Sequence, residues 1–149
     1  MKKIIRLMFL IIGTICFCCN SKVDKEFQKI VNYFENTHQY KITDDINKVV
    51  IITEGKGCGT CDAAFAQTAL QYLADSSLFL ITAKGNFVDI KPFLALKQNC
   101  FFDWQIELSK FSEFESSRVI YFKDNKIDTI VVINSTEILQ QLEYFGKDN

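Results

Sequence analysis

The sequence of 149 residues predicts a single α/β domain with a mixed central sheet covered by helices on both faces. Amphipathic helical patterns alternate with short runs of β-branched and aromatic residues, which is the order that crossover helices between parallel strands produce. The last two of these runs are separated only by a short polar turn, which predicts an antiparallel hairpin. Parallel and antiparallel strands are therefore expected in one sheet.

The first half of the domain should contain two helices and one strand. Residues 23–35 place apolar side chains at helical spacing, on a face formed by Val23, Phe27, Ile30, Val31 and Phe34. The β-branched run at 48–53 predicts the first strand. The alanine-rich pattern at 62–74 predicts a helix with a broad core-facing side.

The next segment should add the central strand and further helical turns. The fully apolar run at 78–82 predicts a buried strand. Residues 87–98 form a helical pattern that tolerates Pro92 near its start. A short extended run is expected at 100–104 and a helical turn at 108–114.

A hairpin and a helix should end the domain. Two β-branched strands at 118–122 and 127–133 are joined by a polar turn at 123–126. Asn134 or Ser135 can cap the final helix. Its buried face should consist of Ile138, Leu139, Leu142 and Phe145.

The N-terminus resembles a bacterial lipoprotein signal peptide. Three basic residues precede an apolar stretch at 7–15, which is too short to span a bilayer comfortably. Cys19 follows a small residue, Cys18, as in a lipobox, so we expect residues 1–18 to be removed and Cys19 to carry the lipid. Residues 19–22 would form a lipid-anchored tether. The alternative is an uncleaved membrane anchor with incidental cysteines.

The remaining chain, residues 23–149, has the length of one domain. Removal of residues 1–18 takes away three basic residues and changes the formal charge from −1 to −4. No basic patch or arginine-rich stripe remains, so nucleic acid is not expected as a partner. Three of the six cysteines remain, and exported proteins usually pair their cysteines.

The segment Cys58-Gly59-Thr60-Cys61 lies between the first predicted strand and the second helix, which is the geometry of a dithiol redox site. A thiol at the first turn of a helix faces unpaired N–H groups and the positive end of the helix dipole, which lower its pKa. Cys61 lies on the same helix face and can close a disulfide with Cys58. Cys100 follows as a buried, unpaired thiol in an apolar run.

Other interpretations of the motif are a static disulfide, a zinc site and a peroxidase. A disulfide across two intervening residues constrains little of the unfolded chain. Zinc needs about four ligands, and only Cys100 and His38 could join the pair, without motif spacing. We expect His38 in a solvated loop. A peroxidase would have a threonine and a proline upstream, and only Thr53 is present. We expect no metal and no cofactor.

This order of elements, with Cys-x-x-Cys after the first core strand, resembles the thioredoxin fold over residues 23–145. The closer similarity is to secreted, membrane-tethered redoxins of the thioredoxin-like and alkyl hydroperoxide reductase/thiol-specific antioxidant type. The resemblance implies that Cys58 attacks a partner and that Cys61 resolves the mixed disulfide. The two residues between them would tune the redox potential, and the charge of Lys56 would lower the pKa of Cys58.

Three positions depart from that family. Ser117 stands in place of its cis-proline beside the disulfide, and we expect a trans bond there because a cis bond costs ~2.5–4 kcal/mol. Gly57 replaces an aromatic residue before the first cysteine. Ile52 replaces a buried acid six residues before the nucleophile, so proton transfer would depend on water, Lys56 or Glu54.

The sequence therefore predicts a lipid-anchored thiol-disulfide oxidoreductase of the bacterial cell envelope, facing the periplasm or the exterior. Its partner would be an envelope protein that carries a thiol or a disulfide, and the N-terminal lipid would hold it at the membrane. The alternative is a non-catalytic module of the same fold that serves binding or assembly. The serine at position 117 favours that alternative.

Overall fold

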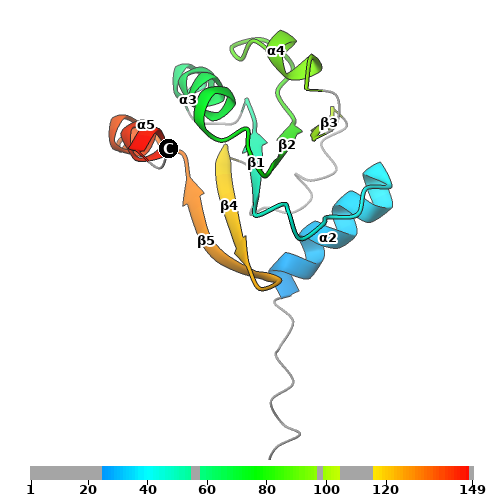
Figure 1. The fold of residues 1–149 in the computed structure, drawn as a ribbon. Coiled ribbons are helices and arrows are strands. Elements are labelled where there is room, and N and C mark those ends of the chain that lie inside the picture. The colour runs from blue at the N-terminus through cyan, green and yellow to red at the C-terminus, as the bar shows by residue number, and fades with distance from the viewer. Residues whose placement is uncertain (1–24, 55–57, 97–98, 105–115, 148–149) are drawn as a thin grey trace, which may run out of the picture.

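The computed structural model describes residues 25–54, 58–96, 99–104 and 116–147. The elements follow one another as α2 (Lys25–His38), β1 (Lys48–Ile52), α3 (Gly59–Tyr72), β2 (Ser77–Ile81), α4 (Lys91–Leu94), β3 (Cys100–Phe102), β4 (Arg118–Lys123), β5 (Lys126–Val132) and α5 (Ile138–Lys147). Helices and strands alternate until the final hairpin and helix (Figure 1). The predicted helical turn at 108–114 lies outside the described residues.

The strands form one mixed sheet in the order β3-β2-β1-β4-β5. β1 pairs in parallel with β2, and β2 in parallel with β3. β4 runs antiparallel to both β1 and β5. The prediction of parallel and antiparallel strands in one α/β sheet is confirmed. Because β1 lies between β2 and β4, the segment that follows β1 emerges at the middle of the sheet edge.

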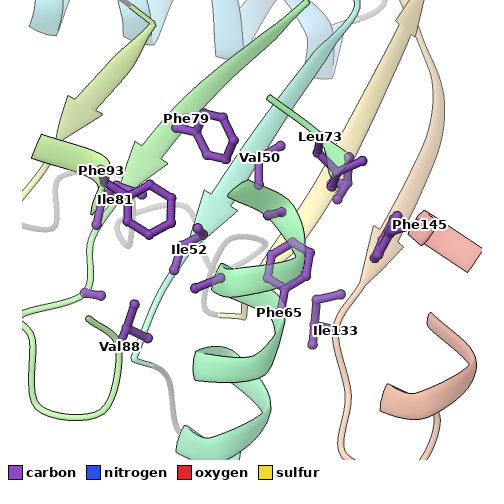
Figure 2. Packing of buried hydrophobic residues seen from close by; sticks show 14 residues of the cluster. Val50, Ile52, Phe65, Leu73, Phe79, Ile81, Val88, Phe93, Ile133 and Phe145 are labelled. Carbon is purple, nitrogen blue, oxygen red and sulfur yellow. The ribbon is translucent and has the colours of Figure 1, made fainter. Parts of the chain in front are cut away.

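Alternate residues of the central strands belong to two hydrophobic clusters. Val50 and Ile52 of β1 pack with Phe65 of α3 and with residues of α4 and α5, as Figure 2 shows for part of the first cluster. Val49 and Ile51 pack with residues of α2, Phe34 among them, in the second cluster. Successive side chains of a strand point to opposite faces of the sheet. The sheet therefore holds apolar contacts on each of its faces.

The predicted helix at 87–98 is much shorter in the structure, where α4 covers only Lys91–Leu94. The backbone N–H groups of Lys84, Phe87 and Val88 donate to the carboxylate of Glu54 at 3.0, 2.8 and 3.0 Å. These contacts anchor residues 84–88 against the side chain that follows β1, and α4 begins only after this anchored segment. The local helical pattern alone therefore did not locate the start of the helix.

The hairpin and the last helix form largely as predicted. Asp124 and Asn125 both have positive φ, 52° and 58°, as a two-residue type I′ hairpin turn requires. Asn134 Oδ1 accepts hydrogen bonds from the N–H groups of Thr136 and Glu137 and so caps the turn before α5. The expected burial of Leu139 is wrong, because this side chain is exposed while Phe145 is buried.

Candidate functional site

Cys58 and Cys61 lie at the start of α3, at the sheet edge where β1 ends. Cys58 is the N-cap residue: its backbone is extended and its Sγ accepts a hydrogen bond from the Cys61 N–H at 3.3 Å. The Cys58 carbonyl also accepts from Cys61 and Asp62. The helix thus begins at Gly59, before the predicted start at 62, because the cysteine sulfur acts as the capping group.

The two cysteines form a disulfide, with their Cα atoms 5.1 Å apart. Cys58 is half-buried, and Thr60 Oγ1 lies 3.1 Å from its sulfur. Cys61 is only 9% exposed. A reagent from solvent therefore meets Cys58 first, and the buried Cys61 is placed to react only with its neighbour.

A buried carboxylate directly follows the disulfide. Asp62 is 7% exposed, and Ser117 Oγ donates to its Oδ1 at 2.6 Å. Ser117 Oγ in turn accepts from the Thr53 N–H at 3.1 Å. One serine hydroxyl thus ties the end of β1, the first turn of α3 and the start of β4 together.

Sequence reasoning missed Asp62. An acid in the first turn of a helix usually serves the helix dipole at the surface, so its type and position gave no sign of burial. Its only distinguishing feature in the sequence is that it follows the second cysteine. The peptide bond between Ser116 and Ser117 is trans, as predicted. Ser117 directs its hydroxyl at Asp62 and Thr53.

A cavity of about 180 Å³ opens beside the disulfide. Its lining includes both cysteines and Asp62, together with Thr53, Ser116, Ile133, Asn134 and Ser135. Thr53 is buried, and its Oγ1 has no hydrogen-bond partner among the described protein atoms. A polar cavity of this size has room for water, and the threonine hydroxyl offers such a water a partner.

An exposed aromatic ring covers the opposite side of the first turn. Phe87 is 67% exposed, and a Cβ built on Gly59 would lie 2.8 Å from its Cγ. The lack of a side chain at Gly59 therefore leaves room for the ring of Phe87. Phe87 thus lies against Gly59, the residue that follows the first cysteine.

Glu54 holds the segment that carries Phe87. Besides the three backbone donors, Asn86 Nδ2 donates to its carboxylate at 3.1 Å. Partial burial by itself would raise the pKa of Glu54, but the hydrogen bonds from Val88, Phe87, Lys84 and Asn86 outweigh it, so the pKa is lowered. The carboxylate of Glu54 therefore holds this loop in its charged form.

His38 and Cys100 lie away from the disulfide pair. His38 is the last residue of α2, half-buried against the ring of Phe101, so the expected solvated loop position is wrong. Its Nε2 lies 3.2 Å from the hydroxyl of Tyr33, which donates to the buried Asp103 at 2.6 Å. Desolvation lowers the pKa of His38, while Asp103 opposes the shift.

Cys100 is a free cysteine, as predicted, although it is half-buried rather than fully enclosed. Burial raises the pKa of its thiol to about 12. Its thiolate is therefore scarce near neutral pH, which makes it a poor nucleophile.

Two predicted residues, Cys19 and Lys56, lie outside the described part of the chain. No group of three or more histidine, cysteine or acidic side chains among the described residues could hold a metal ion. None of the described helices is long and apolar enough to cross a membrane. Comparisons with protein-family models, with curated proteins and with solved structures give no match to this chain.

Proposed function

We propose that this chain is a thiol-disulfide oxidoreductase of the thioredoxin-like class. The observation that carries the proposal is the pairing of a solvent-accessible N-cap cysteine, Cys58, with a buried one, Cys61. The N–H groups of the first turn of α3 stabilise negative charge on Cys58 when the disulfide is reduced. These features distinguish an attacking thiol from a resolving thiol.

The reaction exchanges one disulfide for another. In the reducing direction, the Cys58 thiolate attacks one sulfur of a partner's disulfide. The new Cys58–partner bond forms as the partner's own S–S bond breaks, and the released partner thiolate takes up a proton. Cys61 then loses its proton and attacks Cys58, which releases the second partner thiolate. Two electrons and two protons pass to the partner, and the Cys58–Cys61 disulfide remains. The oxidising direction is the exact reversal of these steps, with a partner dithiol as the reductant.

We assign to Asp62 the role of accepting the proton that Cys61 loses when it attacks Cys58. It is buried, it follows Cys61 in the chain, and both side chains line the same cavity. Ser117 holds one carboxylate oxygen in place. A water in the cavity would connect the carboxylate to the sulfur without a direct contact.

The arrangement of the sheet supports the thioredoxin-like assignment. The chain passes from β1 through the dithiol and α3 to the parallel strand β2, and a β4–β5 hairpin and α5 follow. One hydrophobic cluster contains residues of α2, and the other contains residues of α3 and α5. This separation supports helices on both faces of the sheet. The edge of the sheet beside β2 is formed by β3, which follows β2 and α4 in the chain.

A lipid on Cys19 and a place in the bacterial envelope complete the proposal. The basic and apolar N-terminal residues and the Cys18-Cys19 pair support it. Metabolic labelling with a fatty acid should tag the protein, and Cys19→Ala should abolish the tag. A tag that survives in Cys19→Ala but not in Cys18→Ala would move the lipid by one residue, and no tag in the wild-type chain would contradict the anchor.

Trapping of mixed disulfides tests the proposed chemistry. Cys61→Ser removes the resolving thiol and should accumulate Cys58-linked envelope proteins, which are visible on a non-reducing gel. Cys58→Ser should accumulate none, because Cys61 is buried. Cys100→Ser is the matched control and should behave as the wild type. If Cys61→Ser traps nothing and both cysteines of the reduced protein alkylate at the same slow rate, the non-catalytic binding module is the better account.

A further inference from the structure

We propose that Phe87 and the hollow behind it select the partner, by taking an apolar side chain about two residues from the partner's reactive cysteine. This inference rests on the proposed exchange reaction at Cys58. The hollow has a volume of about 130 Å³ and lies between α3 and α4, with Phe87 at its rim. Its apolar lining is formed by Ala63, Ala66, Leu70, Pro92 and Phe93.

The hollow is next to the dithiol along one face of α3. Gly59 contacts the Phe87 ring, and Ala63, Ala66 and Leu70 follow at spacings that keep a residue on the same helix face. Ala63 lies five residues after Cys58, which corresponds to roughly 7 Å along the helix axis. An extended chain covers that distance with about two residues. This spacing sets where the apolar side chain of the partner must be.

The position of the ring is imposed by the protein. Four hydrogen bonds to Glu54 fix residues 84–88, although the phenyl ring that they position remains in water. An exposed ring over an apolar hollow is stabilised when another apolar group covers both. A volume of about 130 Å³ is close to that of a cavity that holds a benzene-sized group, so the hollow has room for a single leucine-sized side chain.

The two sides of the disulfide therefore differ in chemistry. The cavity that contains Asp62 presents polar and apolar surface in about equal parts, whereas the hollow beneath Phe87 is mainly apolar, with Gln67 and Asp89 as its polar members. A small disulfide touches only Cys58. A partner with an apolar residue near its cysteine touches Cys58 and Phe87 together.

The test uses the reduced full chain and three disulfides that share the same thiol chemistry. One is cystine, and the other two are disulfide-linked pairs of pentapeptides. Each pentapeptide has a central cysteine flanked by alanine, with leucine at both ends in one and serine at both ends in the other. The wild type should react with the leucine peptide about tenfold faster than with the serine peptide. Phe87→Ala should remove this preference and leave the cystine rate unchanged.

Tyr144→Ala is the matched control, because Tyr144 is an exposed aromatic residue of α5, and α5 lies near Tyr72 at the far end of α3. It should keep the full preference. Gly59→Ala should reduce the preference because its Cβ would displace the ring, and Phe87→Ala added to it should have no further effect. Equal unfolding midpoints in urea would show that the variants remain folded.

The possible outcomes separate the two proposals. A preference that survives Phe87→Ala, or a wild type without any preference, overturns the role of Phe87 while cystine exchange still supports the dithiol chemistry. An equal loss of all three rates in Phe87→Ala means that the ring only supports the first turn of α3, and that also overturns the inference. If the wild type reacts with no disulfide faster than Cys58→Ser does, the proposed function itself fails.

Discussion

Asp62 is the residue that we propose accepts the proton of Cys61. Its carboxylate is buried beside Cys61 and holds the hydroxyl of Ser117. Asp62→Asn keeps the size and the acceptor oxygen but removes the base. Resolution of a mixed disulfide by Cys61 should then slow by about a hundredfold near neutral pH. The defect should shrink as pH rises, because hydroxide then removes the thiol proton.

Stopped-flow measurement of the release step between pH 6 and about 10 would record this profile. Ser117→Ala is the control: it removes the hydrogen bond to Asp62 and keeps the carboxylate, so the loss should be smaller. A rate for Asp62→Asn that parallels the wild type at every pH would exclude the carboxylate from the proton transfer.

His38 should make the stability of the protein depend on pH. Desolvation lowers the pKa of His38 in the folded state below its unfolded value of ~6.5. The unfolded chain then binds the proton more readily, so stability falls as pH drops through ~6.5 and the loss is complete below the folded pKa. Asp103 opposes this shift and limits its size.

Urea unfolding at pH 7.5 and at pH 5 would show the effect in the wild type and in His38→Gln. The variant cannot titrate at this position, so its midpoint should fall less between the two pH values. Carboxylates and other groups titrate equally in both proteins, so the difference between the two changes in midpoint isolates the imidazole. An identical change in midpoint in both proteins would show that His38 has the same pKa in the folded and unfolded states.

At the scale of the elements, the β4–β5 turn is a specific point of sensitivity. Asp124 and Asn125 adopt left-handed backbone conformations, which asparagine tolerates and β-branched residues do not. Asn125→Val should therefore lower the free energy of unfolding by about 1–2 kcal/mol. Asn125→Gly should match or slightly exceed the wild type, because glycine has no Cβ penalty. Thermal unfolding of the three proteins decides this, and a valine variant as stable as glycine would contradict the turn geometry.

At the scale of the whole molecule, the two hydrophobic clusters should unfold as one unit. Phe65 belongs to the cluster with α3 and Phe34 to the cluster with α2, and both side chains are buried. The clusters use alternate residues of the same strands, so loss of one exposes the other. Phe65→Ala and Phe34→Ala should each cost about 3–5 kcal/mol.

Far-ultraviolet circular dichroism and tryptophan fluorescence should give the same midpoint in each of these variants, as a two-state transition requires. The exposed Leu139→Ala is the control and should change stability by less than about 0.5 kcal/mol. Two separate transitions in Phe34→Ala would mean that α2 and its cluster unfold independently of the rest.

The sequence by itself determined the features that depend on neighbours along the chain. A β-branched run located β1, a fully apolar run located β2 and predicted its burial, and the polar turn at 123–126 predicted the hairpin. The spacing of Cys58 and Cys61 at a strand-to-helix junction predicted the disulfide. Helix periods, turn preferences and short disulfides are local properties, so a local pattern is sufficient to predict them.

Only the tertiary structure decided which distant groups meet. Ser117 and Asp62 are separated by 55 residues and yet share a hydrogen bond beside the dithiol. Glu54 anchors the backbone of residues 84–88, and Phe87 in this segment lies over Gly59. These contacts depend on strand order and on the paths of the connecting segments. A sequence pattern records that a residue prefers burial or a helix, but it does not record which partner the folded sheet brings to it.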